Sequence, residues 1–166
     1  MSLHEQSIGA TDEWYTPLHV FEALGCRFDM DVAAPLDRTH VCVPTNRWIY
    51  SDSLSWPWEG FIWMNPPFGG RNALVPWLQK FFQHENGIAL VPDRTSAPWW
   101  QCYAKLADQI LFVAPKLKFI GPDGKPGNSP AQGTCLLAVG DRAVDALNMA
   151  QSRGLGLVVV PTGRLG

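Results

Sequence analysis

The chain has 166 residues, of which 46% are hydrophobic and 17% charged, and its formal net charge is −2 at pH 7. This composition is typical of a globular protein of one domain and excludes an extended disordered chain. No apolar run approaches the roughly 20 residues of a membrane-spanning helix, and we expect no signal peptide because the first residues lack an apolar core. Four scattered cysteines without a Cys-x-x-Cys pair indicate reduced thiols in a cytoplasm rather than disulfides or zinc.

The first half of the chain predicts one helix and two strands. Thr16 as N-cap and Pro17 at the first helical position predict a helix that runs to Leu24. Cys26–Ala33 is predicted as the first core strand, and the apolar run Phe61–Met64 predicts the next one. We expect residues 1–12 to be loosely ordered and residues 35–58, which contain several Pro, Ser and Trp residues, to be irregular.

The second half alternates helices and strands. Leu74, Trp77, Leu78, Phe81 and Phe82 recur at helical spacing and predict an amphipathic helix. The expected elements are, in chain order, that helix over 72–84, a strand over 87–92, a helix over 96–107, strands over 109–114 and 133–139 joined by a Gly/Pro-rich loop, a helix over 141–153 and a strand over 155–160. This alternation predicts an α/β fold.

The most informative motif is Asn65-Pro66-Pro67-Phe68, which directly follows the second predicted strand. Each proline fixes its own φ and restricts the residue before it, so the motif predicts a rigid turn at the carboxyl end of the strand. In open α/β sheets this edge binds ligands. The Asn65 carboxamide and the carbonyls after it are fixed acceptors beside the Phe68 ring. They suit a planar group with an exocyclic amine, such as a nucleobase.

Asn-Pro-Pro-(Phe/Tyr) after a strand resembles the catalytic motif of S-adenosylmethionine-dependent amino-methyltransferases, which modify adenine N6, cytosine N4 or glutamine. An ordered set of motifs from about Trp14 to Val139 is similar to phage-type (Dam-like) DNA N6-adenine methyltransferases. The matching segments are Glu13-Trp14-Tyr15-Thr16-Pro17, Phe28-Asp29-Met30-Asp31-Val32-Ala33-Ala34, Asp52, Trp58, Asn65-Pro66-Pro67-Phe68, Leu90-Val91-Pro92 and Lys116-Leu117-Lys118-Phe119.

This resemblance implies an abridged Rossmann-like class I methyltransferase sheet, mostly parallel with an antiparallel terminal strand pair. We expect the abridgement because the chain between Ala33 and Phe61 is too short for two more strands with their crossover helices. The resemblance also implies a phage or prophage protein that acts in the cytoplasm of a bacterial host. The chemistry expected of the motif needs no metal and no covalent enzyme intermediate.

The resemblance assigns the methionine part of S-adenosylmethionine to Thr16-Pro17, with Trp14 and Tyr15 as walls of the site. The alternative is that Thr-Pro is an ordinary helix start. Among the family's acidic positions, Asp52 corresponds to the residue that contacts the adenine amine of the cofactor. Its structural alternative is an Asx-turn within Ser51-Asp52-Ser53.

Asp31 corresponds to the acidic residue of the family's first motif, near the end of the first predicted strand. Val32-Ala33-Ala34-Pro35 follows in place of the usual Gly-x-Gly. Small residues such as Ala33 still permit a close approach of the backbone to the cofactor, but a glycine-based turn is absent.

The candidate substrate-binding residues follow the later strands: Arg94, Trp99, Lys116, Lys118 and Phe119. Strong nucleic-acid binders are usually basic, whereas this chain has a net charge of −2, so DNA binding would depend on a local basic patch. The target adenine must be flipped out of a duplex or already single-stranded. We expect no separate recognition domain, which leaves three alternatives: relaxed specificity, a small site read by short loops, or a homodimer that supplies the missing surface.

Two other functions compete with adenine methylation of DNA. The same chemistry fits another amine: cytosine N4, an RNA base or a protein glutamine. A protein that binds nucleic acid without catalysis is supported by the missing glycine motif, and the intact motif Asn65–Phe68 argues against it.

Overall fold

The computed structural model describes residues 14–70 and 72–163, so the expectation for residues 1–12 lies outside the described part. Four helices, six strands and one 3-10 turn, η1 (Ser53–Ser55), form the described structure. The helices are α2 (Leu18–Leu24), α3 (Val75–His84), α4 (Pro98–Ala104) and α5 (Asp141–Ser152). The strands are β1 (Met30–Asp31), β2 (Ile62–Met64), β3 (Gly87–Pro92), β4 (Gln109–Val113), β5 (Thr134–Val139) and β6 (Gly156–Val159). The predicted α/β class is confirmed.

The six strands form one mixed sheet in the order β1-β2-β3-β5-β4-β6. β1, β2 and β3 pair in parallel, whereas β5 is antiparallel to both β3 and β4, and β6 is antiparallel to β4. The prediction of a mostly parallel sheet with one antiparallel terminal pair was therefore wrong in extent. The reason is that β5 is inserted between β3 and β4 and runs opposite to both, while β6 runs opposite to β4, so that every pairing beyond β3 is antiparallel.

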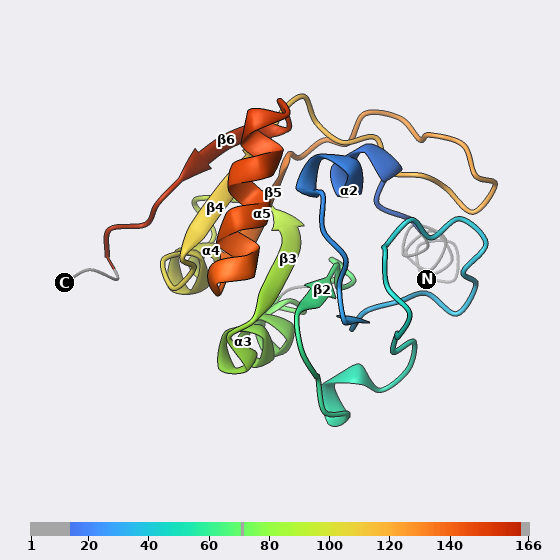
Figure 1. The fold of residues 1–166 in the computed structure, drawn as a ribbon, viewed down its shortest axis with the longest axis horizontal. Helices are drawn as coiled ribbons and strands as arrows, with labels where there is room; N and C mark the ends of the chain where they lie inside the picture. Colours follow the sequence, from blue (N-terminus) through green and yellow to red (C-terminus); the bar gives the residue numbers. More distant parts are fainter. Residues whose placement is uncertain (1–13, 71, 164–166) are drawn as a thin grey trace.

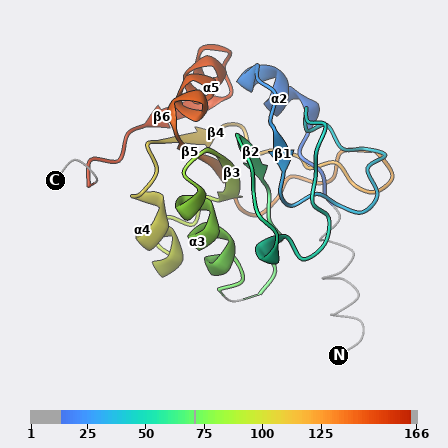
Figure 2. The same ribbon diagram turned by 60° about the horizontal axis from the view of Figure 1, so that its bottom comes forward.

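Helices cover both faces of the sheet: α2 and α5 lie on one face and α3 and α4 on the other (Figure 2). Side chains of a strand alternate between the two faces. In β2 and the residue before it, Phe61 and Trp63 pack with the cluster under α2 and α5, and Ile62 and Met64 pack with the cluster under α3 and α4. Burial on both faces explains why these strands are continuous apolar runs in the sequence.

The first strand is shorter than predicted, because Met30–Asp31 replaces the expected Cys26–Ala33. On its open side β1 is bordered by part of the irregular segment. Asp31 N–H donates to the Arg47 carbonyl at 2.9 Å, and Ile49 N–H donates to the Asp31 carbonyl at 2.9 Å. Residues 47–49 thus occupy the place of a further strand without forming one.

Helix α2 begins at Leu18, with Pro17 as its N-cap in extended conformation and no side-chain cap hydrogen bond. The prediction that Thr16 caps this helix was wrong. The Thr16 side chain is buried instead and makes no hydrogen bond to the first turn of α2.

The long loop between β4 and β5 lies on the same side of the molecule as the chain that follows β1 (Figure 1). An antiparallel bridge ties it to the segment before α2. Tyr15 N–H donates to the Ile120 carbonyl at 2.8 Å, and Ile120 N–H donates to the Tyr15 carbonyl at 2.9 Å. In the described residues, no helix combines the length and apolar character required to cross a membrane.

Candidate active site

Polar residues and the proline motif meet at one edge of the sheet. Asp31 ends β1, Asn65 directly follows β2, and Pro92 ends β3. Because β5 runs in the opposite direction, its first residue, Thr134, pairs with Pro92 at the same edge. This is the edge at which open α/β sheets bind ligands.

A cavity of about 1880 Å³ opens at this edge. It exceeds the roughly 300–1,000 Å³ typical of a site for one small molecule, so it has room for a second group. The predicted site residues that line it are Trp14, Tyr15, Thr16, Asp31, Ala33, Asp52, Asn65, Pro66, Pro67, Phe68, Arg94, Trp99 and Phe119. Three predicted residues do not line it: Pro17, Lys116 and Lys118.

The proline motif presents a polar group and a ring to the cavity. Asn65 is half-buried and Pro66 is buried, whereas Pro67 and Phe68 are exposed. The Asn65 carboxamide nitrogen donates to the Thr16 hydroxyl oxygen at 3.0 Å. This hydrogen bond leaves the carboxamide oxygen as the free acceptor of the side chain.

Trp14 and Tyr15 form a wall of the cavity that is joined to the β4–β5 loop. The Tyr15–Ile120 bridge fixes the backbone, and the Trp14 ring lies against Gly121 and Gly127. A Cβ atom at Gly127 would lie 2.4 Å from the Trp14 ring, so this close approach requires glycine. The wall is therefore built from two segments that are far apart in the sequence.

Asp31 is the buried carboxyl group of the site, with 2% of its surface exposed. One of its oxygens accepts a hydrogen bond from Ala33 N–H at 3.2 Å. Burial raises the pKa of Asp31 to about 6, although the hydrogen bond from Ala33 and the charge of Arg38 act in the opposite direction. A cationic or hydrogen-bond-donating ligand beside Asp31 would favour its ionised form.

Asp52 is exposed at the cavity and precedes η1 with a positive φ of 52°. Its side chain makes no cap hydrogen bond, so the Asx-turn alternative receives no support from the structure. Lys80 holds this turn from α3, donating to the Ser53 carbonyl at 3.1 Å, to the Leu54 carbonyl at 2.9 Å and to the Trp56 carbonyl. The turn thus places Asp52 at the cavity.

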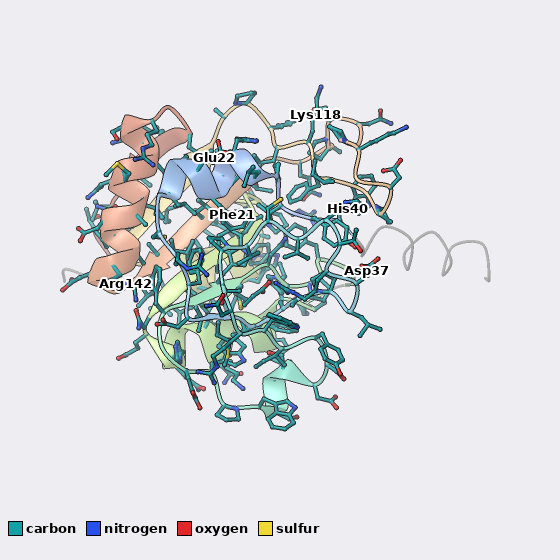
Figure 3. All side chains as sticks on the ribbon, turned by 45° about the vertical axis from the view of Figure 1, so that its right-hand side comes forward. Phe21, Glu22, Asp37, His40, Lys118 and Arg142 are labelled. Carbon is teal, nitrogen blue, oxygen red and sulfur yellow. The ribbon has the colours of Figure 1, made fainter. Side chains whose placement is uncertain are left out.

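The predicted substrate-binding residues separate into two groups. Arg94, Trp99 and Phe119 line the cavity. The Lys116 ammonium donates to the Ala131 carbonyl at 3.1 Å and so braces the β4–β5 loop, while Lys118 is exposed and points away from the loop (Figure 3). The structure does not bring these two lysines into the cavity, and a role for them toward DNA stays a prediction.

The structure adds cavity residues that sequence reasoning missed. Tyr50 and Leu54, from the chain between β1 and β2, form part of the lining. Thr134 also lines the cavity, and its hydroxyl is buried without a hydrogen-bond partner among the described residues. The available signal was a polar residue at the start of an otherwise apolar strand.

Comparison with known proteins gives one match. The sequence matches the family described as DNA N-6-adenine-methyltransferase (Dam) over residues 5–152, which is most of the chain. No curated protein and no solved structure matches it.

Proposed function

The chain belongs to the DNA N-6-adenine-methyltransferase (Dam) family, and from this premise we propose that it transfers a methyl group from S-adenosylmethionine to the N6 amine of adenine in DNA. The observation that carries the proposal is the single cavity in which Asp31 and Asp52 lie with the motif Asn65–Phe68. We propose further that β1, β2 and β3 are the retained part of a Rossmann-like class I methyltransferase sheet. The site of action would be the cytoplasm of a bacterial host that carries the gene on a phage or prophage.

The hydrogen-bond acceptors and the apolar walls of the cavity fit S-adenosylmethionine. The buried Asp31 carboxyl suits the ammonium or ribose hydroxyls, and the Asp52 carboxylate suits the adenine amine. Trp14 and Ala33 add apolar walls, and Ala33 replaces the missing glycine as the small residue at the end of the strand. When bound, this cofactor supplies a methyl group activated by a sulfonium.

The motif after β2 orients and polarises the acceptor amine. The Asn65 carboxamide oxygen and the Pro66 carbonyl each accept one N–H of the amine, which draws the nitrogen toward a tetrahedral geometry and directs its lone pair. Phe68, exposed at the cavity, stacks on the face of the base. These groups act by position and fixed dipoles rather than as a strong base.

DNA reaches the cavity with its target adenine flipped out or single-stranded. Arg94 and Trp99 lie at the cavity and supply a phosphate contact and a stacking surface. Lys116 and Lys118, which lie outside the cavity, would add charge along the β4–β5 loop. A homodimer would extend this limited surface.

The proposal is tested by incubating the protein with methyl-labelled S-adenosylmethionine and unmethylated DNA, followed by nucleoside mass analysis. We expect N6-methyladenine with the intact protein and at least about a hundredfold less with Asn65→Ala, because a lost preorganised polar contact in a transition state costs about that much. Cofactor affinity should remain largely intact in this variant. Asn148→Ala, an exposed position on α5, is the matched control and should be fully active.

Other outcomes redirect or overturn the proposal. Label in N4-methylcytosine, in RNA or in a protein glutamine would keep the chemistry and change the acceptor. The absence of both cofactor binding and label in any substrate would leave a protein that binds nucleic acid without catalysis.

A further inference from the structure

The Thr16 hydroxyl contacts the proposed catalytic amide rather than the helix that follows it. Thr16 is 5% exposed and lines the cavity, and its hydroxyl oxygen accepts the hydrogen bond from the Asn65 carboxamide nitrogen at 3.0 Å. The two residues are 49 positions apart in the sequence, one before α2 and the other after β2. Their contact is therefore a product of the tertiary fold.

The direction of this hydrogen bond matters because a carboxamide has two unlike ends. Its oxygen accepts hydrogen bonds, and its nitrogen only donates them. In the observed direction the nitrogen is engaged and the oxygen is left for an amine. In the reversed direction the cavity would meet N–H groups, which an amine N–H does not bind.

The position of Thr16 is itself fixed by its two neighbours. Tyr15 makes both backbone hydrogen bonds of the bridge with Ile120, and Pro17 is buried where α2 begins. The backbone that carries this hydroxyl is therefore fixed before Thr16 by the Tyr15–Ile120 bridge and after it by the buried Pro17. A rigid acceptor of this kind orients the group that donates to it.

We propose that Thr16 is a positioning residue that orients the Asn65 carboxamide with its oxygen toward the acceptor amine. The proposal rests on the methyl-transfer function proposed above and gives Thr16 a role different from the cofactor contact implied by the family resemblance. The two roles predict different kinetics. A residue that only held the cofactor would change cofactor affinity, and saturating cofactor would restore the rate.

The kinetic experiment compares Thr16→Val, which keeps the shape and removes the hydroxyl, with Thr16→Ser, which keeps the hydroxyl. At saturating S-adenosylmethionine and DNA, we expect Thr16→Val to lower kcat about ten- to a hundredfold, as expected for a misplaced reacting group. Cofactor Kd by calorimetry should change less than about threefold, a difference small beside that loss. Thr16→Ser should retain most of kcat. Unchanged kcat in Thr16→Val, or a loss that saturating cofactor restores, would overturn the proposal.

A second measurement is independent of catalysis. In the free protein, the side-chain amide resonance of Asn65, assigned by its absence in Asn65→Ala, reports its hydrogen bond in a ¹⁵N correlation spectrum. We expect this resonance to shift in Thr16→Val and to return toward its original position in Thr16→Ser; an unmoved resonance in Thr16→Val would overturn the orientation. If the intact protein transferred no methyl group, the proposed function would fail, while this spectrum would still decide whether Thr16 orients Asn65.

Discussion

The two sides of the sheet are built differently. β3 and β5 pair over six residues each, from Gly87 opposite Val139 to Pro92 opposite Thr134, whereas β1 and β2 pair only through Met30–Ile62 and Asp31–Trp63. The side that contains β3, β5 and β4 has long, regular strands, and the side that contains β1 and β2 consists of short strands joined by long loops. We call the first the scaffold side and the second the site side.

The site side and the scaffold side contribute different kinds of residues. Most acidic and motif residues of the cavity belong to the site side, including Asp31, Asp52 and Asn65. The scaffold side contributes mainly buried apolar residues such as Leu90, Leu111 and Leu136. Substitutions on the two sides should therefore have effects of different kinds.

The largest effect on stability is expected from Leu136→Ala at the centre of β5. Leu136 is fully buried between Leu90 and Leu111 of the neighbouring strands. Loss of its side chain should lower the free energy of unfolding by about 2–5 kcal/mol, measured by urea denaturation. At a temperature where the variant is folded, kcat should be unchanged.

Leu157→Ala on β6 is the matched control, because Leu157 is 61% exposed. Its effect on unfolding should stay within about 0.5 kcal/mol. A clear fall in kcat for folded Leu136→Ala would break the separation between the two sides.

A smaller effect of opposite sign is expected from Asp31→Asn on the site side. Burial raises the pKa of Asp31 to about 6, so the unfolded chain, in which the pKa is lower, releases the proton more readily than the folded protein. The charged carboxylate therefore lowers stability increasingly as the pH rises from about 4 to about 6, and the full cost is present at pH 7. Asp31→Asn should raise the free energy of unfolding at pH 7 by on the order of 1–3 kcal/mol and weaken cofactor binding at least about tenfold.

Asp29→Asn is the control for this substitution. Asp29 lies just before β1, is about half exposed at its side chain and accepts a hydrogen bond from Phe61 N–H at 2.7 Å. It does not line the cavity, so cofactor affinity should remain unchanged. A variant Asp31→Asn that lost stability and kept cofactor affinity would show that this carboxylate is part of the scaffold.

The smallest effect concerns pH. If ionised Asp31 binds the cofactor, affinity should be level above pH 6 and fall by up to about tenfold per pH unit below it, because the protonated form dominates there. The charge of Arg38 lowers the pKa of Asp31, so Arg38→Gln should move this transition to higher pH. Calorimetric titrations from pH 5 to 8 measure the profile. A profile as steep in Asp31→Asn as in the intact protein would assign the pH dependence to another group.

Sequence reasoning succeeded where one local pattern decides the structure. The apolar run between Gly87 and Pro92 predicted β3 with its observed bounds, because a strand buried on both faces is apolar throughout. The proline motif after Met64 lies at the carboxyl end of β2, as predicted. Both features are local, so they can be read without knowing their neighbours.

It failed where long-range contacts decide the structure. Cys26–Ala33 has the composition of a strand, but only Met30–Asp31 forms one, because the neighbouring chain at residues 47–49 provides an irregular partner. Thr16 has the sequence context of a helix cap, and only the fold shows that its hydroxyl meets Asn65. The roles of these residues depend on partners that no short motif reveals.

The Tyr15–Ile120 bridge has a consequence for the order in which the protein assembles during synthesis. The bridge joins positions more than roughly a hundred residues apart, and closing so long a loop has an entropic cost that only the completed contacts repay. A nascent chain that has emerged only as far as β3 contains Asp31 and Asn65 but lacks β4, β5 and the loop between them that contacts Trp14 and Tyr15. The cavity is thus a late product of folding, and a ribosome-bound fragment that ends before Ile120 should be inactive although it carries the entire proline motif.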